Sequence, residues 1–291
     1  MGFQETTGAY QIGALRLGGH TMNGDITLSA AARIGCYGTT SSTNALNGRI
    51  TGNYALDFLG SDGANNVSHI FVLSNPTNDW GGETTVINRA HNASPTGLSG
   101  STTLKLGASN VLPDGSGKGV VKLAPAGASN LAVLELNGYN ETINGLSTTF
   151  AAGAIVRNNH ATDASTLTIG AGDASSSYAG TIANGGAAAL AITKIGSGTL
   201  TLTGTNSYTG DTTVSAGSLK LGNGTTNTAL ADSSTVSIAS SATLELDFPT
   251  GSGSSDTVQK LYLGTPPVQV AAGTYDSVSY THLTLPTKRI V

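Results

Sequence analysis

The chain has little charge, few aromatic residues and a single cysteine. Of its 291 residues 10% are charged and 5% are aromatic, and the net charge is −4. This slightly acidic balance gives a nucleic-acid partner no electrostatic support. A lone cysteine, Cys36, excludes an intrachain disulfide, and we interpret it as a small buried apolar residue. No run of about 18 apolar residues occurs, so no segment is predicted to span a membrane as a helix.

Short apolar runs separated by glycine-rich corners recur along the chain. In residues 192–221, leucines fall on every second position at Leu200 and Leu202 and, after the corner GTNSYTGD, again at Leu219 and Leu221. Such alternation is typical of a strand with one buried face and one solvated face. Two strands joined by a corner, with no helix between them, predict one coil of a β-solenoid.

This segment resembles the passenger-associated transport repeat, also called the autotransporter-associated β-strand repeat. The family is typified by a GxGTLTL run, a GTNxYTG corner and a TTVxAGxLxL run, which residues 196–202, 204–210 and 212–221 carry here. The resemblance implies an exported bacterial chain that forms an extended β-helix. It also implies that an outer-membrane β-barrel elsewhere in the polypeptide often carries such a chain to the cell surface. It implies no reaction.

We therefore predict an all-β fold, a right-handed parallel β-helix that forms a single elongated domain over residues 1–277. At about 20–25 residues per coil, this length predicts about 11–14 coils. Pairing between coils is expected to be parallel, with the closing rungs at 235–276. The stretch 187–192 has some helix propensity, but its length of six residues and its position directly before the repeat favour a strand.

A degenerate copy of the repeat is predicted at about 70–107, in addition to the well-matched copy at 192–222. Its corner aligns Trp80 with Tyr208 and Glu83 with Asp211. An insertion at 88–100 separates this corner from its second strand, as expected for a loop that leaves a solenoid at one edge.

Both ends of the chain are interpreted as artificial. The N-terminus lacks the basic and apolar regions of a signal peptide, so we expect a missing beginning. Residues 278–291 resemble the translation of a sequencing adapter, so we interpret them as a non-biological tail. The chain is accordingly interpreted as a metagenomic fragment whose barrel or anchor lies outside it.

Two glycine-rich segments are similar to ligand-binding motifs but lack features that those motifs require. The segment from Gly115 to Gly119 lacks the first glycine and the Ser or Thr of a phosphate-binding loop, so we interpret it as a corner. The segment from Gly170 to Asp173 is similar to a calcium-binding nonapeptide, but it occurs once, whereas such sites need stacked copies.

The acidic and histidine residues show no catalytic or metal-binding spacing. Glu245 and Asp247 share one strand face, and paired carboxylates can perform acid–base catalysis, but Leu244 and Leu246 take the opposite face. A solvated outer surface is therefore the preferred interpretation for both, and for Glu135. The five histidines have no ligand spacing with one another or with Cys36, and they are His20, His69, His91, His160 and His282. No catalytic, cofactor-binding or metal-binding residues are predicted.

The two corner aromatics, Trp80 and Tyr208, leave two interpretations open. Such rings could stack on sugars, or they could cover the rung below.

Three functional hypotheses follow. The first is a non-catalytic stalk or adhesin-like passenger at the surface of a bacterium, with surface glycans or host and matrix proteins as partners. The second is a polysaccharide lyase or hydrolase, which would need three or more Asp, Arg or Lys side chains converging in a groove. The third is a repeat that only assists the export of a neighbouring module.

Overall fold

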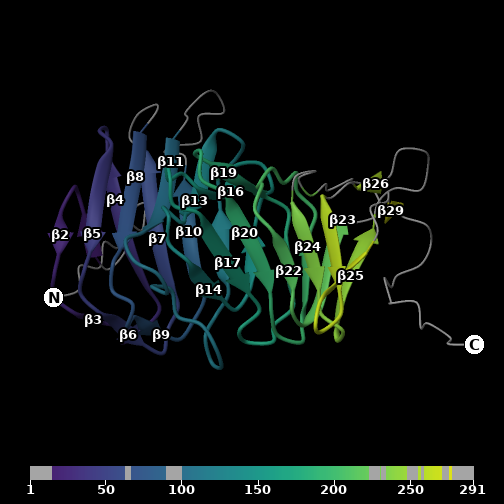
Figure 1. The fold of residues 1–291 in the computed structure, drawn as a ribbon. Helices are drawn as coiled ribbons and strands as arrows, with labels where there is room; N and C mark the ends of the chain where they lie inside the picture. Colours follow the sequence, from purple (N-terminus) through teal and green to yellow (C-terminus); the bar gives the residue numbers. More distant parts are fainter. Residues whose placement is uncertain are drawn as a thin grey trace, which may run out of the picture.

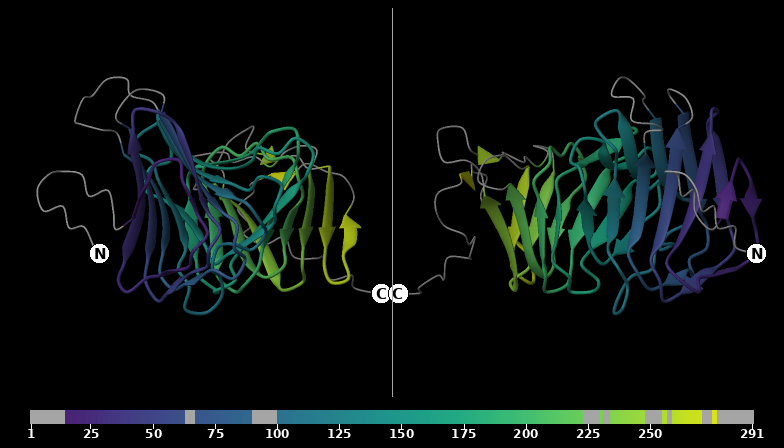
Figure 2. Two further views of the ribbon diagram at one scale, coloured as in Figure 1. Left: turned by 90° about the vertical axis from the view of Figure 1, so that its left-hand side faces the viewer. Right: turned by 180° about the vertical axis from the view of Figure 1, so that it is seen from behind.

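The computed structural model describes residues 15–62, 67–89, 100–222, 230, 234–247, 255–256, 259–270 and 275–276. Every regular element in these ranges is a β-strand. Strands of successive coils pair in parallel, and they stack side by side along one axis from the N-terminal to the C-terminal end (Figures 1 and 2). The predicted all-β parallel β-helix is confirmed.

Three columns of stacked strands form the walls of the helix, and the chain passes through them in a fixed order. The first column contains β1 (Leu15–Leu17), β4 (Ala32–Gly38), β7 (Leu56–Asp62), β10 (Thr84–Arg89), β12 (Val121–Ala124), β15 (Leu146–Thr148), β18 (Ser176–Tyr178), β21 (Thr199–Leu202), β23 (Gly217–Gly222) and β25 (Ala242–Asp247). The second contains β2 (Thr21–Met22), β5 (Ser42–Leu46), β8 (Val67–Leu73), β11 (Gly100–Leu106), β13 (Asn130–Glu135), β16 (Ala154–Asn158) and β19 (Thr181–Gly185). The third contains β3 (Ile26–Thr27), β6 (Ile50–Gly52), β9 (Asp79–Trp80), β14 (Glu141–Ile143), β17 (Ser165–Ile169), β20 (Leu190–Lys194), β22 (Thr212–Val214), β24 (Thr235–Ile238) and β27 (Lys260–Leu263).

Two of the columns, the first and the third, are each divided between two hydrogen-bonded sheets. In the first column β15 and β18 belong to different sheets, but the Leu146 N–H donates to Ser176 Oγ at 3.2 Å. In the third column β9 and β14 are separated by an irregular rung, where the Asn110 N–H donates to the Asn140 carbonyl at 3.1 Å. Hydrogen bonds therefore keep both columns continuous where the regular ladder is interrupted.

Within the described ranges the first column holds ten strands, and therefore ten coils, and the estimate of about 11–14 coils for residues 1–277 stays a prediction. Coil length varies, because Leu200 pairs with Leu219 after 19 positions whereas Val86 pairs with Leu123 after 37. The corners hold insertions of different lengths, and only the strands must keep register with their neighbours.

Apolar side chains from all three columns meet in the interior. In the third coil the ring of Phe58 in β7 lies 5.6 Å from that of Phe71 in β8 and 6.4 Å from that of Trp80 in β9, measured between centroids. All three are fully buried. Burial of one such large apolar side chain stabilises the fold by about 1.5–3 kcal/mol, so each coil contributes its own part of a continuous core.

The strand prediction for 187–192 is correct only from Leu190 on, where β20 pairs in parallel with β17 on one side and β22 on the other, whereas 187–189 precede the strand. Six residues are too few for a stable helix, and the two neighbouring rungs satisfy the backbone hydrogen bonds of a strand.

The expectation of parallel pairing is wrong at the C-terminal side. β28 (Val268–Val270) pairs antiparallel with β27, and β29 (Tyr275–Asp276) pairs antiparallel with β26 (Ser255–Asp256). The connection between β27 and β28 contains only four residues, with Gly264 at a φ of 92°. A turn this short allows a hairpin but no parallel crossover. As a result, β28 occupies the outer edge of the third column.

Candidate functional site

Three contacts hold the GTNSYTGD corner of the repeat, two of them with the preceding coil and one within the corner's own coil. Asn206 Oδ1 accepts a hydrogen bond from the Ile182 N–H at 3.2 Å. Tyr208 is 1% exposed, and its hydroxyl shares a hydrogen bond with Thr212 Oγ1 at 2.9 Å. The Gly210 N–H donates to a carbonyl of the preceding coil at 3.0 Å, and a Cβ at this glycine would lie 2.4 Å from the same oxygen. The corner therefore has room only for glycine there.

The TNDWGGE corner, 128 positions earlier, makes the same three contacts. Asn78 Oδ1 accepts a hydrogen bond from the Ile50 N–H at 2.8 Å. Trp80 is fully buried, and its Nε1 donates to Thr84 Oγ1 at 2.8 Å. A Cβ at Gly82 would lie 2.4 Å from a backbone nitrogen of the preceding coil. These shared contacts support a degenerate copy at 70–107, which stays a prediction.

Burial of both rings decides between the two interpretations of Trp80 and Tyr208. Neither ring is accessible to a sugar, so stacking on sugars is wrong and the aromatics pack inside the coil. Each ring also keeps a hydrogen bond for its polar atom, which buried Tyr and Trp side chains require.

The two corners occupy different positions around the helix. Asp79 in β9 precedes β10, so the first corner joins the third column to the first. Ser207 bridges to Ala183 in the second column and precedes β22, so the second corner joins the second column to the third. The corner motif consequently makes the same set of contacts between different pairs of columns.

A buried lysine holds two turns of the repeat together. Lys194 is 1% exposed, and its Nζ donates to the carbonyl oxygens of Ile195, Gly196 and Ala216, the last in the following coil. Burial lowers the pKa of Lys194, while nearby Asp173 opposes this effect. The ammonium group thus binds carbonyl oxygens of two successive coils.

Glu141 is a buried carboxyl group whose described contacts include no cationic partner. Its side chain accepts hydrogen bonds from the backbone N–H groups of Val111 at 2.9 Å, Leu112 at 3.3 Å and Thr142 at 3.3 Å. Burial raises the pKa of Glu141 from 4.5 to about 8, the three N–H groups oppose the rise, and Asp114 adds to it. Sequence analysis missed this residue, because nothing in its surroundings along the chain distinguishes it from a surface glutamate.

The segment from Gly115 to Gly119 is a corner, as predicted. Gly115 and Gly117 have positive φ values of 88° and 78°. Asn144 of the next coil accepts a hydrogen bond from the Gly115 N–H at 2.7 Å and donates to the carbonyls of Gly115 and Lys118 at 2.8 and 2.7 Å. These backbone groups are occupied by the asparagine side chain, so they do not form a phosphate cradle.

A hydrogen-bonded chain of thiol, hydroxyl and imidazole lies inside the N-terminal coils. Cys36 Sγ is 3.0 Å from Ser42 Oγ, which is 3.0 Å from His69 Nδ1. Cys36 is 1% exposed, as predicted, and His69 is fully buried. Sequence spacing did not reveal this group, because stacking of β5 on β8 brings Ser42 beside His69. With Cys36 and His69 buried and Ser42 partly exposed, the group forms polar contacts between the first two columns.

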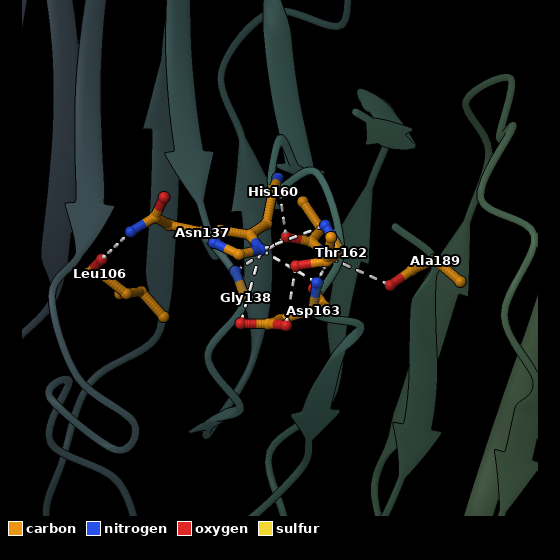
Figure 3. Close-up of polar contacts among 8 residues, drawn as sticks. Leu106, Asn137, Gly138, His160, Thr162, Asp163 and Ala189 are labelled. Carbon is orange, nitrogen blue, oxygen red and sulfur yellow. Dashed lines mark hydrogen bonds and ion pairs between the residues drawn. The ribbon is translucent and has the colours of Figure 1, made fainter. Parts of the chain in front are cut away.

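The corner around His160 is built from backbone-directed polar contacts (Figure 3). His160 Nδ1 accepts hydrogen bonds from the N–H groups of Asp163 at 2.9 Å and Thr162 at 3.4 Å. Asn158 accepts a hydrogen bond from the Gly138 N–H at 2.9 Å and donates to the Asp163 carbonyl at 2.9 Å. The imidazole nitrogen that could act as a base is therefore used to shape the turn.

No metal centre emerges from the described ranges, in which no group of three or more His, Cys, Asp or Glu side chains could hold an ion. Asp173, in the segment similar to a calcium-binding repeat, accepts a hydrogen bond from the Ser197 N–H at 2.7 Å. His20 is exposed, and His91 and His282 lie outside the described residues.

The prediction for Glu135 is wrong. Its side chain is 4% exposed and accepts hydrogen bonds from Arg157 Nε and the Asn159 N–H, each at 2.6 Å. The next coil supplies both donors, and they compensate the carboxylate for its lost hydration. Glu245 and Asp247 do remain partly exposed, and both bind Lys220, at 3.0 and 2.7 Å.

Three charged side chains from successive coils meet at the outer surface of the third column. Asp79 Oδ1 is paired with Lys118, and Asp79 Oδ2 lies 3.7 Å from Arg49 Nη2. The hydrogen bond from Lys118 lowers the pKa of Asp79. The trio has the residue types that the enzyme hypothesis requires, but mutual pairing weakens Asp79 as a base.

Comparison with known proteins gives one match. Residues 192–221, about a tenth of the chain, match the family model of the passenger-associated-transport-repeat. No curated protein and no solved structure matches the chain. The described ranges also contain no helix that could span a membrane.

Proposed function

We propose that this chain is a non-catalytic structural segment of an exported bacterial surface protein, a β-helical stalk or adhesin-like passenger that aids secretion and display. The observation that carries the proposal is that the transport repeat at 192–221 forms one coil of a continuous parallel β-helix. The repeat family supports an autotransporter-passenger role with a surface or extracellular location.

The architecture suits a chain that folds after crossing a membrane. Each coil is built from adjacent sequence and contacts its neighbours, so folding can proceed from one end without distant segments having to meet. The single cysteine allows no intrachain disulfide that could obstruct passage of an unfolded chain. We infer that the segment functions together with an outer-membrane barrel or another anchor, and that surface glycans or matrix proteins are its partners.

Surface display tests the proposal directly. The chain is placed between a signal peptide and an outer-membrane β-barrel, and the amount on intact cells is measured with an antibody and by protease shaving. In a first variant residues 200–218 are deleted, which removes one coil and brings Leu219 to the position of Leu200. In a control, residues 34–57 are deleted, which brings Phe58 to the position of Ile34.

A several-fold lower display in the first variant, with the control close to the full chain, supports a role of the repeat in export. Equal display of all three chains contradicts it. The third hypothesis, in which the repeat only assists export, is favoured if the displayed chain binds neither glycans nor matrix proteins.

The Arg49–Asp79–Lys118 trio keeps a polysaccharide-degrading enzyme as a second candidate. Its test is incubation of the chain with acidic polysaccharides, followed by measurement of new reducing ends and unsaturated products. Activity that disappears in Lys118→Ala favours the enzyme, and absence of products from the unmodified chain counts against it.

A further inference from the structure

A continuous row of hydroxyl groups runs along the outer face of the third column. In each of six successive rungs one outward side chain, between two buried neighbours, carries a hydroxyl. We call these side chains the hydroxyl row, and they are Thr142, Thr168, Thr193, Thr213, Ser237 and Tyr262. Direct register pairs each member with the next. The strands β14, β17, β20, β22 and β24, which carry the first five members of the row, follow one another along the helix axis in Figure 1.

The spacing of the row is set by the backbone. Adjacent parallel strands lie about 4.8 Å apart, so five steps from Thr142 to Tyr262 extend over about 24 Å. β-branching restricts the rotamers of the four threonines, which favours a similar orientation of successive hydroxyl groups. The row therefore presents one chemical group at nearly constant intervals along the helix axis.

The hydroxyls of the row are available to a ligand. From Thr142 to Ser237, none of them forms a side-chain hydrogen bond with another described residue. All five side chains are partly exposed. Tyr262 ends the row with an aromatic ring, and its hydroxyl has only a long 3.5 Å contact with Gln269. A neutral row with an aromatic end offers hydrogen bonds and a stacking surface but no charge.

We propose that the hydroxyl row binds a neutral linear polysaccharide that lies along the helix axis. This inference rests on the display function proposed above and names the chemical class of the partner. Extended β-linked glycans repeat their hydroxyl groups once per sugar, at an interval close to the rung spacing. The absence of charged members in the row favours a neutral polymer over a polyuronate.

Other outward faces lack this regularity. In the first column, Thr201 pairs with Lys220, which pairs with Glu245. Lys220 and Glu245 form an ion pair at 3.0 Å across this face. The first column has similar threonine content without an unbroken row, so it offers a matched control surface.

The test is binding of the purified chain to soluble mixed-linkage β-glucan by affinity electrophoresis, and to cellulose and chitin by co-sedimentation. The row variant combines Thr168→Val, Thr193→Val and Thr213→Val. Valine keeps the shape and β-branching of threonine but removes the hydroxyl. The control variant combines Thr199→Val, Thr201→Val and Thr243→Val on the first column. A third variant, Thr193→Lys, places a charge in the middle of the row without altering the core.

We expect the unmodified chain and the control variant to bind at least one neutral glycan. The row variant should bind it at least tenfold more weakly, and Thr193→Lys should also bind it more weakly. Absence of binding by the unmodified chain overturns the proposal, as does equal binding by the row variant or an equal loss in the control. If the row variant does not fold, Thr193→Lys alone decides.

Two further results also overturn the proposal. Stronger binding to polygalacturonate than to any neutral glycan would assign the ligand site to charged residues instead. Inhibition of ice recrystallisation without glycan binding would show that the row orders water. Neither result depends on export, so failure here is distinguishable from failure of the display assay.

Discussion

Protonation of Glu141 is predicted to control the stability of the coils on either side of it. This carboxyl group has a pKa of about 8 in the folded chain, against 4.5 when unfolded, because burial removes it from water. Between these two values the folded chain binds more protons than the unfolded chain. The stabilisation is therefore complete below pH 4.5 and is lost as the pH rises through 8.

The size of the effect follows from the pKa difference. One pKa unit corresponds to about 1.4 kcal/mol, so raising the pH from 4.5 to 7 lowers the free energy of unfolding by up to about 3 kcal/mol. Replacement by glutamine removes this titration. Glutamine places an NH2 group, which cannot accept a hydrogen bond, where the carboxyl group has its second oxygen, so one of the N–H groups of Val111 and Leu112 loses its acceptor. The free energy of unfolding of Glu141→Gln is therefore expected to be about 1 kcal/mol lower, at every pH, than that of the chain with a protonated Glu141.

When the free energy of unfolding is plotted against pH, the curves of the unmodified chain and of Glu141→Gln are consequently expected to cross. At pH 4 the unmodified chain should be more stable than Glu141→Gln, and at pH 8 the order should be reversed. The measurement is urea unfolding followed by circular dichroism from pH 4 to pH 8.5. Because a solenoid can unfold in parts, hydrogen exchange of the Val111 and Leu112 amides provides a local readout.

Glu245→Gln is the matched control, since this carboxylate is partly exposed and paired with Lys220. Its difference from the unmodified chain should change little over the same pH range. A Glu141→Gln difference that stays constant with pH, or that grows in favour of the unmodified chain as pH rises, would refute the reasoning.

Two further predictions concern the repeat corner. Gly210→Ala places a Cβ 2.4 Å from a carbonyl oxygen of the preceding coil, so it should lower the free energy of unfolding, measured in urea, by several kcal/mol. The control Gly127→Ala has no atom within 4 Å of the new Cβ and should lower it by under about 1 kcal/mol. Equal losses in the two variants would contradict the tight corner. Tyr208→Phe removes the hydrogen bond to Thr212, which should lower the free energy of unfolding by about 1 kcal/mol and reduce the melting temperature accordingly. An unchanged melting temperature would show that this hydrogen bond does not stabilise the fold.

Much of the fold could be predicted from local sequence. Alternation at Leu200 and Leu202 reports which strand face is buried, because strand geometry has a period of two. The corner motif around Tyr208 spans only eight residues, so the position of this corner could also be predicted from the sequence. The antiparallel turn after β27 was not predicted, since GTPP between apolar runs is compatible with both a hairpin and a longer corner.

The candidate sites were harder to predict. Glu135 lies between two leucines in the sequence and Glu141 between Asn140 and Thr142, yet both are buried where a neighbouring coil supplies donors to them. Likewise Ser42 and His69 meet through the register of two rungs, 27 positions apart. Coil length varies with each insertion, so the sequence does not show which residues stack.

The sequence by itself determined the strands, the corners, the transport repeat and the lack of catalytic spacing, because these follow from residue patterns within a short stretch of chain. The tertiary structure alone decided which side chains align from rung to rung. That alignment buries Glu141 and the Cys36–Ser42–His69 chain, and it joins scattered threonines into one hydroxyl row. The physical reason is that parallel register places residues about 19 to 37 positions apart within one strand spacing, a relation that no local pattern encodes.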